Sequence, residues 1–282
     1  MVLALMLGSA MLAACGGDGR NGALRPTTTT RRSVSTPTST TSSTTTTIST
    51  TAPPVTTAPP TAPTAPPSTA PPGPATLISR GDPGRMVVAL TFDAGSDLGY
   101  APAILDTLRA AGVPAAFGLT GNWVRAHPDV ARRIAADGHL MINHTDDHRS
   151  FTGFSTGTAP LTAAERRKEL DGAEAAIVAT TGRGTRPWFR PPYGDTDPSV
   201  QADVAADGYG YEVLWTVDSL GWKGLSTDQI TARCLDQAVP GAIYLFHVGS
   251  ASQDSAALPA IIAGLRQRGY GFVTIPQIAG GA

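Results

Sequence analysis

Ionisable side chains stand at the ends of several apolar runs in this sequence, and together they could carry out hydrolysis. They are Asp93, His144, His148, Arg190, Asp218 and His247, which come after the runs 87–92, 140–143, 188–189, 213–217 and 242–246. If these runs are parallel strands, the side chains gather at one edge of the sheet, where α/β folds place their chemistry. Aspartate and histidine can exchange protons there, and an arginine can hold a carboxylate in its charged form. The pattern therefore predicts a single hydrolytic site.

His144 and His148 have the spacing of a metal-binding pair. Residues four apart can place both imidazoles on one face of a helical turn. This spacing alone is weak evidence for a metal, but the position of the pair beside other ionisable groups strengthens it. Two imidazoles suit zinc, with cobalt, nickel or iron as alternatives.

Strand-like and helix-like patterns alternate from residue 87 to the C-terminus, which predicts an α/β fold with a parallel sheet. Strands are expected at 87–92, 115–119, 140–143, 188–190, 213–217, 242–246 and 272–275, and helices at 101–111, 129–137, 162–181, 199–207, 228–237 and 256–268. Thr162 and Glu165 have capping-box spacing, and Gly112, Gly138 and Gly208 stand where helices should stop. Seven strands indicate a distorted (β/α)7-type barrel or an incomplete one.

The N-terminal segment predicts export and attachment to a membrane. Residues 1–14 are almost wholly apolar, and Leu12-Ala13-Ala14-Cys15 resembles the lipobox of bacterial lipoproteins, in which Cys15 is lipidated. The alternative is an ordinary secretory signal. Residues 16–75 are rich in Thr, Ser, Pro and Ala, so we expect a disordered linker, followed by a catalytic domain at 76–282.

Charge and cysteine content restrict the partners. The formal net charge is −1 and basic clusters are lacking, which argues against nucleic acid as a partner. Cys234, the second of two cysteines, is expected to be a small buried apolar group. We expect a monomer outside the cytoplasm, lipid-anchored to the outer face of the cell membrane or secreted, that contacts the membrane only through its lipid.

Five short motifs occur in a fixed order and resemble those of polysaccharide deacetylases, carbohydrate esterase family four. They are Leu90-Thr91-Phe92-Asp93, Asn143-His144-Thr145-x-x-His148, Phe189-Arg190-Pro191-Pro192-Tyr193-Gly194, Val217-Asp218-x-x-x-Trp222 and Leu245-Phe246-His247. The resemblance covers about residues 86–275. It implies a distorted seven-stranded barrel that removes acetyl groups from sugars with the help of one divalent metal.

The resemblance also implies a role for each matching residue. Asp93 would be the base, held ionised by Arg190, and Tyr193 would offer its backbone N–H to the oxyanion. His247 would protonate the leaving amine, with Asp218 orienting the imidazole.

Further positions are implied to bind the metal and the substrate. His144 and His148 would hold the metal. Trp222, Leu245 and Pro191 would shape the place of the acetyl group, although Trp222 could instead pack in the core.

Two positions depart from the family pattern. The acid that usually follows the base and binds the metal is replaced by Ala94. Asp97 is the best substitute, because the Gly95-Ser96 turn could bring it back, whereas Asp146 and Asp147 are expected to point away. The second departure is Gly221, where many relatives have an acid before the tryptophan.

These observations favour an enzyme that deacetylates N-acetylated sugars of peptidoglycan or a chitin-like glycan in the cell wall. An O-acetyl esterase acting on a polysaccharide is one alternative. The other is a non-catalytic glycan-binding module with a degenerate metal site, which only Ala94 supports.

Overall fold

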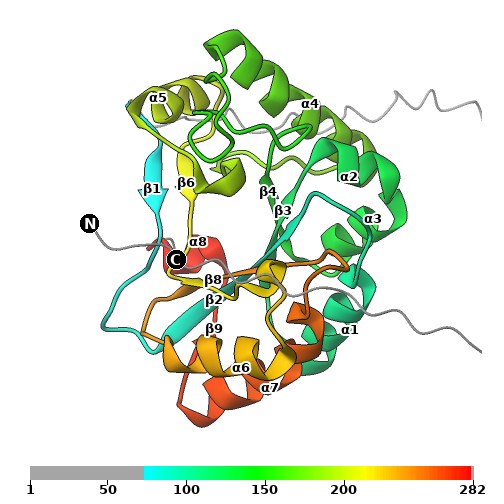
Figure 1. Cartoon of the computed structure of the whole chain (residues 1–282), viewed down its shortest axis with the longest axis vertical. Coiled ribbons are helices and arrows are strands. Elements are labelled where there is room, and N and C mark those ends of the chain that lie inside the picture. Colours follow the sequence, from blue (N-terminus) through cyan, green and yellow to red (C-terminus); the bar gives the residue numbers. More distant parts are fainter. Residues whose placement is uncertain (1–72, 281–282) are drawn as a thin grey trace, which may run out of the picture. The chain divides into compact units, whose positions relative to one another are not determined.

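The computed structural model describes residues 73–280, in which helices surround a sheet of parallel strands (Figure 1). The strands are β1 (Thr76–Ile78), β2 (Val87–Ala94), β3 (Ala115–Leu119), β4 (Leu140–Asn143), β5 (Trp188–Phe189), β6 (Tyr211–Val213), β7 (Val217–Asp218), β8 (Ile243–His247) and β9 (Gly271–Phe272). The predicted signal, the lipidation site at Cys15 and residues 16–72 of the linker predicted at 16–75 lie outside the described part of the chain.

The helices occupy the connections between these strands. They are α1 (Ala101–Ala111), α2 (Gly121–Ala126), α3 (Pro128–Ala136), α4 (Ala163–Thr181), α5 (Pro198–Ala206), α6 (Thr227–Asp236), α7 (Asp254–Gln267) and α8 (Ile275–Ile278), with single 3₁₀ turns η1 (Pro192–Gly194) and η2 (Gly221–Lys223). The capping box at Thr162 and Glu165 is present, and Gly112 ends α1 with a φ of 62°. No helix in residues 73–280 is long and apolar enough to cross a bilayer.

The sheet has the order β1-β6-β5-β4-β3-β2-β8-β7, with β9 paired to β2. The predicted strand at 213–217 is wrong as a single element, because β6 and β7 lie near opposite ends of this order. Between them the chain crosses the gap: the Leu214 N–H donates to Ile78 O at 2.8 Å and the Thr216 N–H to Ile243 O at 2.8 Å. The crossing segment joins the two edges, and the fold is the distorted, incompletely paired barrel that the alternation predicted.

The remaining differences from the expected elements are small. Strand β1 and helix α2 were not predicted, since each is too short to show a period. The expected strand at 272–275 is only β9, because residues 275–278 turn into α8.

Alternation along β2 decides which side chains reach the site. Val88, Leu90, Phe92 and Ala94 join the outer apolar cluster beneath the helices, with Phe92 stacked between two other rings. Ala89 faces inward, in a second cluster with residues of α8. Because side chains alternate, Asp93 lies on the inner face with Ala89, at the C-terminal end of the strand.

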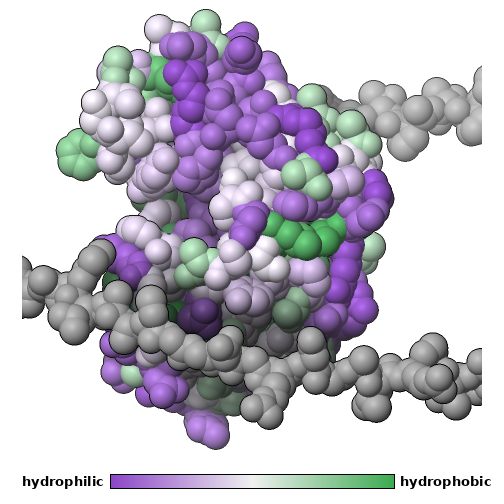
Figure 2. Space-filling model, turned by 45° about the vertical axis from the view of Figure 1, so that its right-hand side comes forward, coloured by the Kyte–Doolittle hydropathy of each residue, from purple (hydrophilic) through white to green (hydrophobic). Residues whose placement is uncertain are grey.

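The outside of the helices is mainly polar. In the space-filling view, which turns the side of α1 to α4 toward the reader, hydrophilic residues predominate and hydrophobic spots are small (Figure 2). The apolar residues of these helices face the sheet instead, as Ile104, Leu105 and Leu108 do in α1. This is the ordinary pattern of amphipathic helices that cover a sheet.

A buried carboxyl lies within the sheet itself. Glu212 of β6 is fully buried in register with Leu77 and Phe189 of the neighbouring strands. One of its oxygens accepts a hydrogen bond from the Thr196 hydroxyl at 2.6 Å, and Oε1 has no partner. Burial raises the pKa of Glu212 to about 7. The folded protein therefore binds this proton more tightly than the unfolded chain does.

Glu212→Gln is expected to change how stability depends on pH. Because the folded pKa lies above the unfolded value, Glu212 lowers the free energy of unfolding as pH rises from about 4.5 to about 7. The glutamine variant lacks this loss, so its stability relative to the parent should rise by on the order of 2–3 kcal/mol between pH 4.5 and pH 8. Urea unfolding of the variant and the parent at the two pH values measures this difference in the free energy of unfolding. Parallel curves for both proteins would contradict the assignment.

Candidate active site

Strand register places three of the key positions side by side. Asp93 of β2 pairs with Gly118 of β3 on one side and with His247 of β8 on the other. Residues in register on parallel strands point to the same face, about 4.8 Å apart. A Cβ atom at Gly118 would lie 2.4 Å from Asp93 Oδ1, so only glycine leaves room for the carboxylate. His247 and Asp93 are thus neighbours on the inner face.

Arg190 fixes the carboxylate of Asp93. Its guanidinium is fully buried and donates from Nη1 to Asp93 Oδ1 at 2.8 Å. Nε donates to Val213 O at 2.8 Å and Nη2 to Leu214 O at 3.4 Å. These two bonds orient the guanidinium so that Nη1 points at Asp93 Oδ1. Burial alone would raise the pKa of Asp93, but the Arg190 charge and hydrogen bond, with His144 and His247 nearby, hold it below the usual value. Asp93 is therefore ionised at neutral pH.

His144 is held in one tautomer. Nδ1 lies 2.9 Å from Arg190 O, and because a carbonyl can only accept, Nδ1 carries the proton. Burial lowers the pKa of His144, so the ring is neutral and Nε2 presents a lone pair. Nε2 lies 3.5 Å from Asp93 Oδ2. A lone pair and a carboxylate oxygen facing each other across this gap form a place for a cation.

His148 completes the pair that the spacing predicted. Its ring meets the His144 ring edge-on, with centroids 4.8 Å apart, and contacts the Tyr193 ring at 4.9 Å. Burial, followed by the charge of His144, lowers the pKa of His148 to about 3. Both imidazoles are neutral and available as ligands.

The loops that carry these residues are strained. The four non-glycine residues of positive φ in the described part of the chain are Thr145, His148, Tyr193 and Leu220, with φ between 56° and 70°. All four follow the ends of β4, β5 or β7. Such backbone strain costs on the order of 1–3 kcal/mol per residue and concentrates at functional sites.

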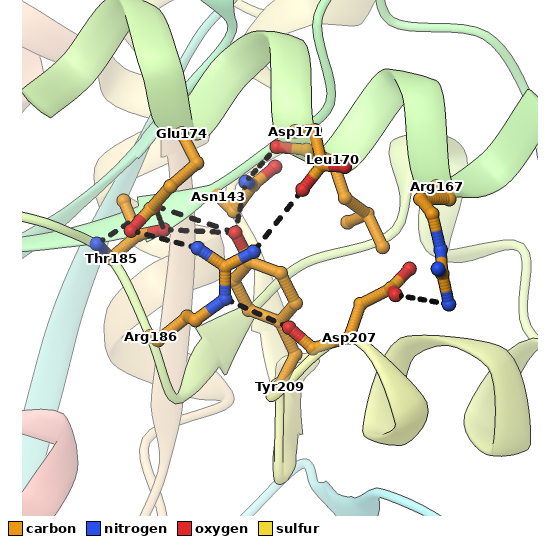
Figure 3. Close-up of polar contacts among 9 residues, drawn as sticks. All are labelled: Asn143, Arg167, Leu170, Asp171, Glu174, Thr185, Arg186, Asp207 and Tyr209. Atoms are coloured by element: carbon orange, nitrogen blue, oxygen red, sulfur yellow. Dashed lines mark hydrogen bonds and ion pairs between the residues drawn. The ribbon is translucent and has the colours of Figure 1, made fainter. Parts of the chain in front are cut away.

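Polar contacts behind β4 hold the histidine loop in place. Asn143 donates to Leu170 O at 3.0 Å and to the Tyr209 hydroxyl at 2.7 Å, within the network around Glu174 and Arg186 (Figure 3). Its own oxygen accepts the Thr145 N–H at 2.9 Å. The residue before His144 is therefore anchored on both sides.

Helix α4 supports the same loop through a buried carboxyl. Glu169 Oε2 accepts the N–H groups of Asp146 and Asp147 at 3.1 and 3.0 Å. Asp146 turns away from the histidines, as predicted: it binds Arg125 at 2.7 Å and lies against the backbone at Gly121.

Asp97 is not brought to the histidine pair. It is exposed, and its carboxylate accepts the Ser250 N–H at 2.9 Å and the Ser250 hydroxyl. Within residues 73–280, no group of three or more His, Cys, Asp or Glu side chains is arranged to hold a metal. The turn after β2 carries the Asp97 carboxylate toward Ser250 in the loop after β8.

Asp218 and His247 are also arranged differently from the expectation. Asp218 ends β7 in register with Leu245, but its Oδ1 accepts the Leu220 N–H at 2.9 Å and its Oδ2 the Trp222 Nε1–H at 3.3 Å. His247 Nδ1 is buried and has no partner. The carboxylate that does contact His247 is Asp254, which accepts its backbone N–H at 2.8 Å.

The residues expected to meet the substrate divide into two groups. Leu245 and Pro191 are buried, whereas the side chains of Tyr193 and Trp222 are each 51% exposed. Core packing is therefore excluded for Trp222. Beside His148 and Tyr193 lies a cavity of about 400 Å³, whose wall includes Arg149, Ser150 and Thr156. The site thus opens onto a space large enough for a sugar.

Comparison with known proteins agrees with this geometry. The family model described as Polysaccharide deacetylase matches residues 80–212. A peptidoglycan-N-acetylglucosamine deacetylase of Bacillus cereus is 36% identical over 194 residues, which cover 68% of this chain and 67% of the relative. The chain belongs to the polysaccharide deacetylase family.

Two solved structures of this family show the same fold. The crystal structure of a peptidoglycan N-acetylglucosamine deacetylase superposes with a TM-score of 0.66 at 32% identity, covering 73% of this chain and 94% of that one. A pseudoenzyme of carbohydrate esterase family four from Bacillus anthracis gives 0.65 at 31% identity, covering 72% and 68%. The fold of this chain is therefore shared by an enzyme and by a pseudoenzyme.

The histidine pair of this chain fits a divalent metal with two protein ligands. The neutral rings of His144 and His148, with the lone pair of His144 Nε2 directed at Asp93, are suitable donors. A third protein ligand is lacking in the described arrangement.

Sequence reasoning missed three residues that shape the site. Asp254 looked like an ordinary acid near a helix start, and Glu169 like one of many acids in a polar helix. Gly118 left a signal, because an isolated glycine in an apolar strand marks a close approach.

Arg190→Met is expected to destabilise the protein by about 3–5 kcal/mol, because it leaves the buried Asp93 carboxylate without its cation. Adding Asp93→Asn should recover much of this loss, since no buried charge then lacks a partner. Denaturant unfolding of both single variants and the double variant at pH 7 gives the coupling energy. Strictly additive losses would show that the pair is not coupled.

Proposed function

We propose that this protein hydrolyses the N-acetyl groups of sugars in peptidoglycan or a chitin-like wall glycan at the cell envelope. The observation that carries the proposal is the arrangement on the inner face of β2 and β8. Asp93 is held ionised by Arg190 and lies in register with His247. Its Oδ2 is 3.5 Å from the unprotonated Nε2 of His144. The name of the Bacillus cereus relative supports the substrate class.

The protein groups divide the proton transfers between them. Asp93 takes a proton from the attacking water, and its ionised form is the one that Arg190 stabilises. His247, its neighbour in register, returns a proton to the leaving amine nitrogen.

A backbone N–H stabilises the charge that develops on the acetyl oxygen. Tyr193 has a φ of 62°, a conformation held by the Pro-Pro-Tyr-Gly turn around it, and its ring lies against His148. Its N–H is the group we assign to the oxyanion, an interaction often worth about 3 kcal/mol.

We further propose that His144 and His148 bind one divalent metal, with zinc the first candidate. When bound, the metal acidifies water and polarises the acetyl carbonyl. Arg190 fixes His144 through its carbonyl oxygen, and Glu169 fixes the loop between the two histidines.

A non-catalytic glycan-binding module is the second candidate, and one observation favours it. Ala94 has no donor atom, and its side chain belongs to the outer apolar cluster. The structural neighbour named as a pseudoenzyme shows that this fold also exists without activity.

Acetate release from purified peptidoglycan and from chitin oligomers tests the proposed reaction. We expect release that chelation abolishes and zinc or cobalt restores, and Asp93→Asn should reduce it at least about 100-fold, because the base is then neutral. O-acetylated xylan serves as the control for an esterase. A folded, glycan-binding protein that releases no acetate with any metal would identify a binding module.

Metal content distinguishes the two histidines from Asp97. We expect His148→Ala to lose bound zinc and Asp97→Ala to keep it, because Ser250 already occupies the Asp97 carboxylate. Zinc is measured by dialysis at fixed free zinc followed by elemental analysis. Equal losses in the two variants would mean that Asp97 moves to the metal after all.

A further inference from the structure

A fully buried carboxylate stands directly behind His247. Asp254, the first residue of α7, accepts the His247 backbone N–H on Oδ2 at 2.8 Å. The Asp254 backbone N–H donates to Ser252 Oγ at 3.2 Å. The other carboxylate oxygen of Asp254, Oδ1, is buried without a partner, as is Nδ1 of His247. Two unsatisfied buried polar atoms on adjacent residues are unusual and call for a functional explanation.

The space around Asp254 Oδ1 belongs to residue 221. A Cβ atom at Gly221 would lie 2.5 Å from Asp254 Oδ1 and 2.2 Å from Ser252 Oγ. No side chain can occupy position 221 while Asp254 keeps this orientation. The carboxylate from α7 therefore fills the volume that a side chain on η2 would otherwise enter.

The carboxylate that sequence motifs assign to His247 is committed elsewhere. Asp218 binds the Leu220 N–H and the Trp222 indole. Its own carbonyl oxygen accepts from Arg233 at 2.7 Å, which holds the strand end in place. Asp218 supports the exposed Trp222 and not the imidazole.

We propose that Asp254 is the positioning residue that fixes His247 and stabilises its protonated form. This inference rests on the proposed function, in which His247 gives a proton to the leaving amine. Asp254 does so through the backbone N–H of His247 and through a negative charge buried next to that residue.

Other titratable groups also lie near His247. Across the inner face, Asp93 on β2 and the histidines His144 and His148 act on His247 from the substrate side. On the α6 side, Cys234 faces Asp254, and burial raises the pKa of its thiol to about 12, so it is neutral.

No cation neutralises the Asp254 carboxylate directly. It takes part in no ion pair with Lys or Arg within residues 73–280. Burial raises the pKa of Asp254, while the backbone N–H and the charge of His247 oppose that shift. The charge of His247 is the one that this carboxylate can stabilise.

Asp254→Asn tests the proposal, because asparagine keeps the size and one acceptor oxygen but removes the charge. We expect kcat for acetate release to fall about 10-fold or more with KM unchanged. The high-pH limb of the profile, which reports loss of the His247 proton, should move about one pH unit lower. Asp218→Asn is the matched control: it should weaken substrate binding through Trp222 and leave the limb in place.

A relocated carboxylate provides a rescue. Gly221→Asp alone should be damaging, because its side chain meets both Ser252 and Asp254, whereas Gly221→Asp with Ser252→Gly and Asp254→Gly should recover part of kcat and the position of the limb. Thermal unfolding of each variant checks that the protein is folded.

A measurement without turnover separates this inference from the proposed reaction. NMR titration of the His247 imidazole, assigned with His247→Gln, should show a lower pKa in Asp254→Asn than in the parent and no change in Asp218→Asn. Unchanged titration and kcat in Asp254→Asn, or effects confined to Asp218→Asn, would overturn the proposal. A parent that releases no acetate but shows the NMR shift would refute only the reaction.

Discussion

The site depends on one residue, Arg190, and on the number of groups it holds at once. Its backbone N–H binds Asn143 O, its carbonyl oxygen accepts from His144, and its guanidinium binds Asp93 and two carbonyls of the crossing segment. One buried residue thus sets the charge of Asp93, the tautomer of His144 and the path of the chain that joins the barrel edges. Because burying a guanidinium requires nearly all of its donors to be satisfied, none of these contacts can change alone.

Strand register does the rest of the positioning. The inner face receives every second residue, so Asp93, Gly118 and His247 converge while Phe92 and Ala94 turn to the helices. This explains why Ala94 is a substantial departure and not a minor one. Its side chain belongs to the outer apolar cluster and offers no donor atom to the histidine pair.

The sequence predicted what depends on periodicity and order, and missed what depends on direction in space. Parallel strands with polar residues at their ends were recognisable from the alternating patterns, and the ends did converge. The run 213–217 looked like one strand because apolar content does not record that a chain leaves one sheet edge for another. The direction of Asp97 could not be predicted for a related reason: a glycine-serine turn can swing either way, and Ser250, 153 residues away, decides which. Asp254 was invisible because nothing local distinguishes a buried helix-start acid from an exposed one.

The two departures from the family pattern have different physical consequences. At Gly221 the missing side chain is matched by a carboxylate from α7 that occupies the same volume, whereas at Ala94 no neighbouring acid takes the place of a ligand. The groups proposed for proton transfer, Asp93 and His247 with Asp254, are therefore all present. The proposed metal site has only the two imidazoles of His144 and His148. Within residues 73–280, four left-handed non-glycine residues, a buried ion pair and a buried carboxylate all carry a cost in stability. A surface that only binds glycan needs none of them, since aromatic rings such as Trp222 and a cavity would suffice. Their joint presence supports the proposed proton transfer over glycan binding alone.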